Sequence, residues 1–150
     1  MRIALFEPEI AGNVGAVLRL AACMGAAVDL IEPMGFVWND RRVRRAAMDY
    51  IDHVEIARHA GFDAFRGTIG ARRLVLFTTK AAQSAYDFAY APDDVLLFGK
   101  ESAGVPPEVA DVCEARVRIP LRAEVRSLNL ATATALALGE ALRQTGALPA

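Results

Sequence analysis

Short apolar runs alternate with helix-patterned segments along the whole chain, and this alternation constrains the fold more than any other feature. The runs at residues 73–78 (RLVLFT) and 94–98 (DVLLF) are continuous, which is typical of strands covered on both faces of a sheet. Helical patterns between such runs predict an α/β fold with a mostly parallel sheet. A length of 150 residues without repeats or linkers predicts a single domain, 1–150.

The local patterns predict the following elements. Strands are expected at residues 2–6, 27–31, 53–56, 73–78, 94–98 and 115–119. Helices are expected from Asn13 as the N-cap to residue 24, and at residues 40–47, 62–66, 106–112 and 128–145. Gly25 and Gly146 follow the first and last helices, where glycine commonly ends a helix.

Composition excludes several classes of protein. With 54% hydrophobic and 23% charged residues, the chain is too apolar to be disordered, and no uncharged run approaches the ~18 residues of a transmembrane helix. Glu7 and Glu9 interrupt any signal-peptide core, so a cytoplasmic location is expected. Cys23 and Cys113 lack metal-ligand spacing, and neither a disulfide nor a metal site is predicted. Cys23 is expected to be a buried thiol, because its helix is apolar.

One cation interrupts the first helix. Val14, Val17, Leu18, Ala21 and Met24 form an apolar stripe, whereas Gly15, Arg19 and Ala22 share another face. Arg19 either extends to solvent or an ion pair, or it presents its donors to a phosphate or carboxylate, with Gly15 leaving room for that ligand.

Two loops after predicted strands are candidate ligand sites, because ligands of open α/β sheets bind beyond the carboxyl ends of strands. Gly99 and Gly104 bracket the first loop, GKESAGVP, which is either a binding loop or an ordinary turn. The second runs from residue 118 to residue 130 and contains Arg126. There, Ser127 or Asn129 either contributes to a site or simply caps the last helix.

Three segments in order resemble the three motifs of the SPOUT class of RNA 2′-O-ribose methyltransferases, and the TrmL (YibK-like) group most closely. They are Asn13-x-Gly15-x-x-x-Arg19 after EPE, Gly99-x-Glu101-x-x-Gly104-Val105-Pro106, and Ile119-Pro120 with Ser127-Leu128-Asn129-Leu130. The segments IEPMGF (31–36), DRRVRRA (40–46), Asp49-Tyr50 and TTK (78–80) add to the resemblance, which covers nearly the whole chain.

The resemblance implies a SPOUT-type fold with a C-terminal deep trefoil knot, a homodimer packed through the first and last helices, and no separate RNA-binding domain. It also implies S-adenosyl-L-methionine as the cofactor and an RNA ribose 2′-hydroxyl as the methyl acceptor. The positions it assigns to cofactor binding are Phe77, Thr78, Gly99, Glu101, Gly104, Ile119, Ser127, Leu128 and Asn129.

Within this resemblance the substrate is the wobble nucleotide, a cytidine or modified uridine at position 34, of leucine tRNAs. Arg19 and Asn13 match catalytic positions. Because a guanidinium stays protonated and is a poor base, Arg19 is expected to bind a phosphate and stabilise alkoxide charge, while Asn13 holds the loop. Binding of the anticodon stem-loop is assigned to Arg41, Arg42, Arg44, Arg45 and Arg126, and the lesser alternative for the cluster at 41–45 is a solvated helix face.

Gly139 departs from the pattern, because close relatives carry a tyrosine before the glutamate that is Glu140 here. This glycine puts the substrate in question more than the fold. The alternatives are therefore a 2′-O-methyltransferase acting on another tRNA or rRNA position, and a non-catalytic dimer that binds RNA or cofactor.

Overall fold

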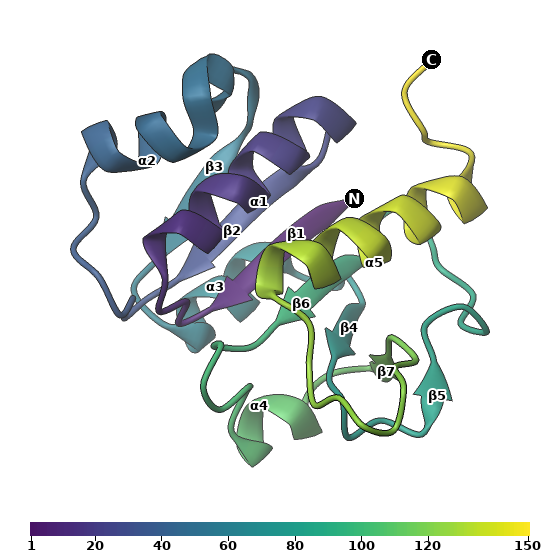
Figure 1. The fold of residues 1–150 in the computed structure, drawn as a ribbon. Coiled ribbons are helices and arrows are strands. Elements are labelled where there is room, and N and C mark those ends of the chain that lie inside the picture. Colours follow the sequence, from purple (N-terminus) through teal and green to yellow (C-terminus); the bar gives the residue numbers. More distant parts are fainter.

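A computed structural model describes residues 1–150, which form a seven-stranded sheet flanked by helices (Figure 1). The strand order is β3-β2-β1-β6-β4-β7-β5, and every paired strand is parallel. The α/β class and the mostly parallel sheet are therefore confirmed. All strand carboxyl ends consequently lie at one edge of the sheet, where the motif-bearing loops begin.

The elements have the following bounds. The strands are β1 (Arg2–Phe6), β2 (Ala27–Ile31), β3 (Ile56–His59), β4 (Leu74–Phe77), β5 (Gln83–Ser84), β6 (Val95–Phe98) and β7 (Ala115–Arg118). The α-helices are α1 (Ala11–Met24), α2 (Asp40–Ala47), α3 (Phe62–Ile69), α4 (Pro107–Asp111) and α5 (Leu130–Thr145), and η1 (Met48–His53) is a 3-10 helix.

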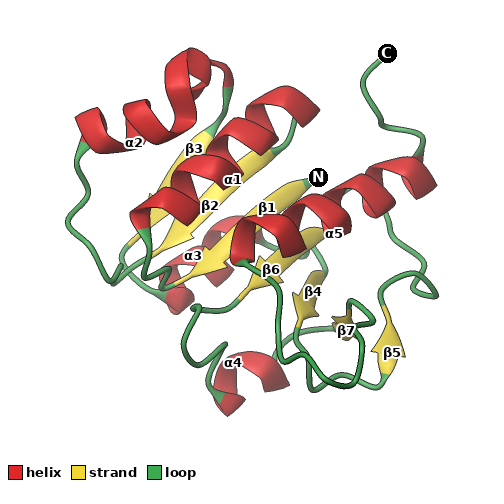
Figure 2. Ribbon diagram, viewed as in Figure 1, coloured by secondary structure: helices red, strands yellow, loops and turns green.

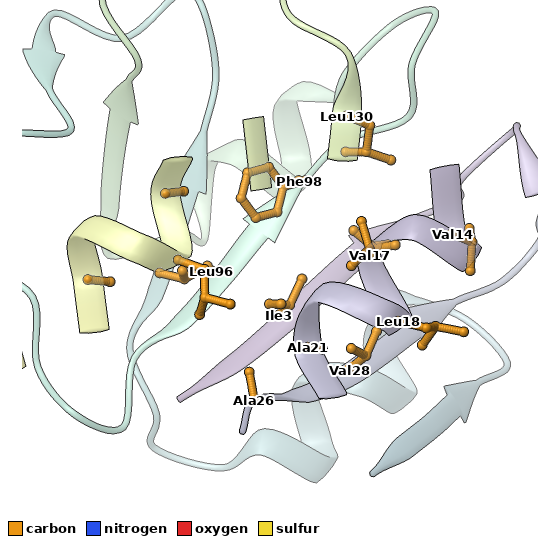
Figure 3. Packing of buried hydrophobic residues seen from close by; sticks show 14 of the residues in the cluster. Ile3, Val14, Val17, Leu18, Ala21, Ala26, Val28, Leu96, Phe98 and Leu130 are labelled. Carbon is orange, nitrogen blue, oxygen red and sulfur yellow. The ribbon is translucent and has the colours of Figure 1, made fainter. Parts of the chain in front are cut away.

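Side chains of the central strands alternate between two apolar clusters, one on each face of the sheet. Ile3 and Leu5 of β1 join the larger cluster with α1 and α5, and Figure 3 shows this packing. Ala4 and Phe6 join the smaller cluster with α3 and α4. Figure 2 shows α1 and α5 together on one face of the sheet. These two helices are thereby fixed against β1 and β6, the strands that lead into two of the motif loops.

Gly15 marks the closest approach of α1 and α2. A Cβ atom at this position would lie 2.2 Å from the Cβ of Ala46, so any larger residue would force the helices apart. The proposal that Gly15 leaves room for a ligand is therefore wrong, since α2 occupies that space. Val14, Val17, Leu18 and Ala21 are buried as the apolar stripe predicts.

Several local predictions need correction. Helix α1 begins at Ala11 with Ile10 as its N-cap, so Asn13 lies inside the first turn and is not the cap. The strand expected at 53–56 lies at Ile56–His59, because η1 extends to His53. The short strand Gln83–Ser84 was not predicted. Cys23 is exposed and not buried, because it lies on the face of α1 that points away from the sheet.

The last helix begins two residues later than expected. Asn129 caps it by accepting hydrogen bonds from the amides of Ala131 and Thr132, whereas Ser127 lies outside the helix. Gly146 adopts the left-handed conformation (φ 67°) that ends the helix, as predicted.

Two fully buried carboxylates, those of Asp29 and Asp94, form hydrogen-bonded ion pairs with arginines. Asp29 accepts hydrogen bonds from Arg2 Nε at 2.7 Å and from the ring Nε2 of His59 at 2.8 Å. Asp94 accepts from Arg73 Nε at 2.8 Å and from the amide of Ala91 at 2.8 Å. A buried carboxylate is stable only when its oxygens are paired in this way. These hydrogen bonds explain how the two carboxylates are tolerated in buried positions.

We expect Asp29→Ala to lower the free energy of unfolding by about 3–5 kcal/mol, because it leaves Arg2 and His59 without their buried partner. Arg122→Ala is the matched control, since the exposed Arg122–Glu124 pair at 3.6 Å contributes about 1 kcal/mol or less. Urea denaturation followed by circular dichroism measures both. An equal effect of the two substitutions would contradict this account.

Candidate active site

The carboxylate of Glu101 joins the loop after β6 to the start of α1. Its oxygens accept hydrogen bonds from the amides of Glu9 at 2.8 Å and Ile10 at 3.2 Å, and from the side-chain amide of Asn13 at 3.2 Å. Helix α1 has no side-chain cap from its own sequence. Glu101 therefore supplies the acceptor, and the negative charge at this end also suits the helix dipole.

Asn13 extends this network to the third motif. Its side-chain oxygen accepts a hydrogen bond from the side-chain nitrogen of Asn129 at 2.9 Å, while its nitrogen donates to Glu101. Asn129 in turn uses its oxygen to cap α5. A continuous chain of hydrogen bonds thus links the loops after β1, β6 and β7. The structure brings three of the predicted site residues, Asn13, Glu101 and Asn129, into direct contact.

Two further pairs hold the first two loops together. Glu7 accepts a hydrogen bond from Lys100 Nζ at 2.7 Å, and Glu9 accepts from the amide and the hydroxyl of Ser102 at 2.8 and 2.7 Å. The hydrogen bonds from Ser102 lower the pKa of Glu9, so this contact persists at neutral pH and weakens only as the pH falls through that lowered pKa. Glu7 has φ 45°, a strained conformation for a residue with a Cβ.

The sequence pattern did not reveal Glu7, Glu9, Lys100 and Ser102 as a group. Each has an ordinary polar side chain in a loop, and only the neighbouring register of β1 and β6, which pairs Leu5 with Phe98, places them opposite one another. The EPE segment before the first motif was the one available signal.

Glycine is required where the loop after β6 closes on itself. A Cβ atom on Gly99 would lie 2.3 Å from the carbonyl carbon of Gly104. Gly104 itself has φ 68°, and the backbones of Lys100 and Gly104 exchange two hydrogen bonds. The two glycines therefore shape the loop that presents Glu101.

The remaining residues assigned to cofactor binding lie along the same edge of the sheet. Phe77 ends β4 and stacks on Phe98, with ring centroids 4.8 Å apart. Ile119, Ser127 and Leu128 belong to the segment between β7 and α5, and Ile119 and Phe77 pack half-buried against the larger apolar cluster. Thr78 Oγ1 accepts a hydrogen bond from the amide of Lys80 at 3.3 Å.

The segment from Ile119 to Asn129 leaves most of its backbone groups free. Its one internal backbone hydrogen bond joins the amide of Val125 to the carbonyl of Arg122, and no intramolecular bond is made by the backbone of Ser127 or Leu128. Free amides and carbonyls beside half-buried apolar side chains suit a ligand with a flat apolar ring and polar edges. The residues present therefore fit a nucleoside-type cofactor.

A separate cavity of about 310 Å³ lies on the α4 side of the Gly99–Gly104 loop. It is lined by Phe6, Glu7, Lys80, Lys100, Ala103, Gly104, Val105, Pro106 and Pro107. Both lysines of the chain line it, but of the residues assigned to the cofactor only Gly104 does so. This cavity is therefore distinct from the surface formed by Phe77 and the segment before α5.

Arg19 lies outside the hydrogen-bonded network. Its side chain is exposed on α1, and its guanidinium carbon lies 5.5 Å from the centroid of the Tyr50 ring. It makes no ion pair with any carboxylate of the chain. Its positive charge is therefore available for an external anion.

The arginines of α2 form an exposed basic face. Arg41, Arg42, Arg44 and Arg45 are all exposed, and only Arg44 has a carboxylate partner, Asp52 at 3.2 Å. Arg126 is exposed in the segment before α5. Apart from Arg44, these side chains have no carboxylate partner, and none of them contacts the network around Asn13.

No group of three or more His, Cys, Asp or Glu side chains could hold a metal ion. None of the helices is long and apolar enough to cross a membrane.

Comparison with known proteins gives consistent results. The tRNA (cytidine(34)-2'-O)-methyltransferase of Beijerinckia indica subsp. indica is 55% identical over 148 residues, covering 97% of this chain and 92% of that protein. The Escherichia coli K12 protein of the same name is 39% identical, covering 97% of this chain and 94% of its own.

Solved structures agree. One from a study of 2-OH methylation of C/U34 on tRNA has a TM-score of 0.91 at 39% identity, covering 95% of this chain and 94% of that chain. An AdoMet-bound rRNA methyltransferase from Sinorhizobium meliloti has a TM-score of 0.85 at 32% identity, covering 95% of this chain and 55% of that chain. Residues 1–139 of the present chain also match the SpoU rRNA Methylase family, and the chain therefore belongs to that family of SPOUT methyltransferases.

Proposed function

We propose that this methyltransferase transfers a methyl group from S-adenosyl-L-methionine to the ribose 2′-oxygen of nucleotide 34, the wobble nucleotide, of leucine tRNAs. The observation that carries the proposal is the hydrogen-bonded chain Glu101–Asn13–Asn129, which joins the three motif loops into one site. Relatives that are 39–55% identical over nearly the full chain are named for cytidine 34, which supports the position.

The cofactor would lie against the loops that follow β4, β6 and β7. Phe77, Ile119 and Leu128 offer half-buried apolar surface, and the free backbone groups of Ser127 and Leu128 offer hydrogen bonds. Glu101 would act indirectly, because its oxygens are already occupied by the start of α1. When bound, S-adenosyl-L-methionine supplies an electrophilic methyl group on a sulfonium centre. Related AdoMet-bound structures support this assignment.

The residues of this chain would contribute by orientation and charge. Asn13 would hold the start of α1 against the cofactor loops, so that the RNA-binding side of α1 keeps a fixed position relative to them. Arg19 would bind a phosphate beside the target nucleotide and stabilise negative charge on the ribose 2′-oxygen as its proton leaves. Its exposed guanidinium without a carboxylate partner suits this role, because no existing ion pair has to be broken.

RNA would bind over α2 and the segment before α5. The exposed Arg41, Arg42 and Arg45 have no carboxylate partner, and they would follow the phosphates of the anticodon stem-loop together with Arg44 and Arg126. We propose that residues 1–150, as a single domain, bind tRNA with this surface.

We further propose a homodimer packed through α1 and α5. These helices pack against each other and expose small and apolar side chains, among them Cys23 and Leu136, which is 43% exposed. The trefoil knot and the cytoplasmic location remain predictions.

The first test is methyl transfer from labelled S-adenosyl-L-methionine to total tRNA from a strain that lacks this gene, followed by mass mapping. We expect the methyl group on the ribose of nucleotide 34. A methyl group elsewhere in tRNA, or transfer to rRNA when total RNA replaces the tRNA, would favour the second candidate, which the glycine at position 139 motivates. Cofactor binding without any transfer would favour a non-catalytic dimer.

In the same assay, Arg19→Ala is expected to bind S-adenosyl-L-methionine normally and to lose about 100- to 1000-fold in transfer rate, the loss typical of removing one charge-stabilising donor. Arg72→Ala is the control, because Arg72 precedes β4 at the opposite edge of the sheet. Full activity of Arg19→Ala would refute the role of Arg19.

Arg42→Ala and Arg45→Ala should each weaken tRNA binding and reduce the slope of log affinity against log salt concentration by about 1, because each removes one phosphate contact. Binding titrations at several salt concentrations measure this slope, with Arg72→Ala as the control for lost charge. Unchanged affinity at low salt would show that α2 is only a solvated face.

Glu101→Ala should lower the free energy of unfolding by about 1–3 kcal/mol, because it leaves three hydrogen-bond donors without their acceptor. It should also lower the affinity for the cofactor. Glu101→Gln should lose less, since one side-chain oxygen remains. Calorimetric titration and urea denaturation measure the two effects. Glu108→Gln, at an exposed position of α4, is the control. Normal cofactor affinity in Glu101→Ala would show that the hydrogen-bond network around Glu101 does not support cofactor binding.

A further inference from the structure

The Arg19 side chain pairs with an aromatic ring instead of a carboxylate. The centre of its guanidinium group lies 5.5 Å from the Tyr50 ring centroid, within the range of a cation–π interaction. Arg2, Arg44 and Arg116, in contrast, each pair with an aspartate. Arg19, which the proposed function requires for RNA binding, therefore lies beside the Tyr50 ring. This ring neither neutralises the charge of Arg19 nor occupies its N–H groups as a carboxylate would.

The fold brings Tyr50 to this position by close helix packing. Because Gly15 lets α2 approach α1 until Ala46 fills the space beside it, the end of α2 lies next to the helical turn that carries Arg19. Met48 then adopts φ 56°, an unusual value for a residue with a side chain, and turns the chain from α2 into η1. Tyr50 lies on η1, which packs against α1.

This arrangement has a specific consequence for the guanidinium group. A ring beside the guanidinium limits the space into which the side chain can rotate. Because the ring does not pair with the N–H groups as a carboxylate does, those groups remain available to an anion. A carboxylate partner would instead occupy those donors. We propose that Tyr50 is a positioning residue, whose ring orients the Arg19 guanidinium for a phosphate or ribose oxygen of the RNA. This inference rests on the role of Arg19 stated under the proposed function.

Two variants at position 50 separate the ring from the hydroxyl. Tyr50→Phe keeps the ring and should transfer methyl groups at a rate within about twofold of the natural protein. Tyr50→Leu keeps apolar volume without a ring and should lose about 5- to 30-fold in single-turnover rate, with unchanged cofactor affinity. Tyr86→Leu removes another exposed tyrosine and is the control. A loss in Tyr50→Phe equal to that in Tyr50→Leu would overturn the proposal, because the hydroxyl would then be the active group.

A double-mutant cycle tests whether Tyr50 acts through Arg19. In an Arg19→Ala background, Tyr50→Leu should cause no further loss of single-turnover rate, because there is no guanidinium left to orient. If the two losses multiply, Tyr50 acts on the RNA by itself and the proposal is wrong. If Arg19→Ala is fully active, the proposed function of Arg19 fails first. If Arg19→Ala is impaired but Tyr50→Leu is not, only the present inference fails.

A spectroscopic measurement gives a readout independent of activity. The Nε–H signal of Arg19 in a ¹⁵N–¹H spectrum, assigned by its loss in Arg19→Ala, should be displaced by the ring current of Tyr50. The displacement should persist in Tyr50→Phe and disappear in Tyr50→Leu. An Arg19 signal that is the same in all three proteins would overturn the proposal.

Discussion

The carboxylate of Glu101 is the contact on which the rest of the candidate site depends. Helix α1 starts without a capping side chain of its own, and Glu101 supplies the missing acceptor from a loop 91 residues away. Because the same carboxylate also holds Asn13, which accepts a hydrogen bond from Asn129, the starts of α1 and α5 are fixed relative to each other. Loss of this one acceptor would release three hydrogen-bond donors and the link between the motif loops.

Helix α1 has three different environments along its surface. One stripe is buried in the larger apolar cluster, the N-terminus contacts the loops after β6 and β7, and the side that carries Gly15 and Arg19 faces α2 and η1. A rigid helix with these three contacts would hold Arg19, the proposed RNA-binding cation, at a constant position relative to the loops that we propose bind the cofactor. This geometry suits a methyltransferase in which positioning contributes much of the catalysis.

The chain belongs to the SpoU family, and its sheet order and motif loops form the framework of the site. Two further features concern individual positions. The two lysines, for example, both line a cavity behind the Gly99–Gly104 loop, and one of them pairs with Glu7. At position 139 a glycine leaves open space, since a Cβ there would meet no atom within 4 Å. A larger side chain would fit at that position, so packing does not explain this glycine.

The sequence by itself determined most of the helices and strands and their order along the chain, although it missed β5 and η1 and misplaced β3. Continuous apolar runs located β4 and β6, helical periodicity located the buried stripe of α1, and parallel pairing then required all motif loops to meet at one edge of the sheet. These features could be predicted because burial repeats with the local period of a strand or helix. The strand at Ile56–His59 was misplaced because its apolar pattern is weak beside η1.

The tertiary structure alone decided which groups touch. Asn13 links two loops and is not a cap, Gly15 contacts Ala46 and not a ligand, Cys23 is exposed, and Tyr50 lies against Arg19. Each of these contacts depends on strand register or on how closely two helices pack. Contacts between residues that are remote in the sequence produce no periodic pattern in it. The sequence could therefore identify candidate residues such as Asn13 and Arg19, but it could not identify the residues that they contact.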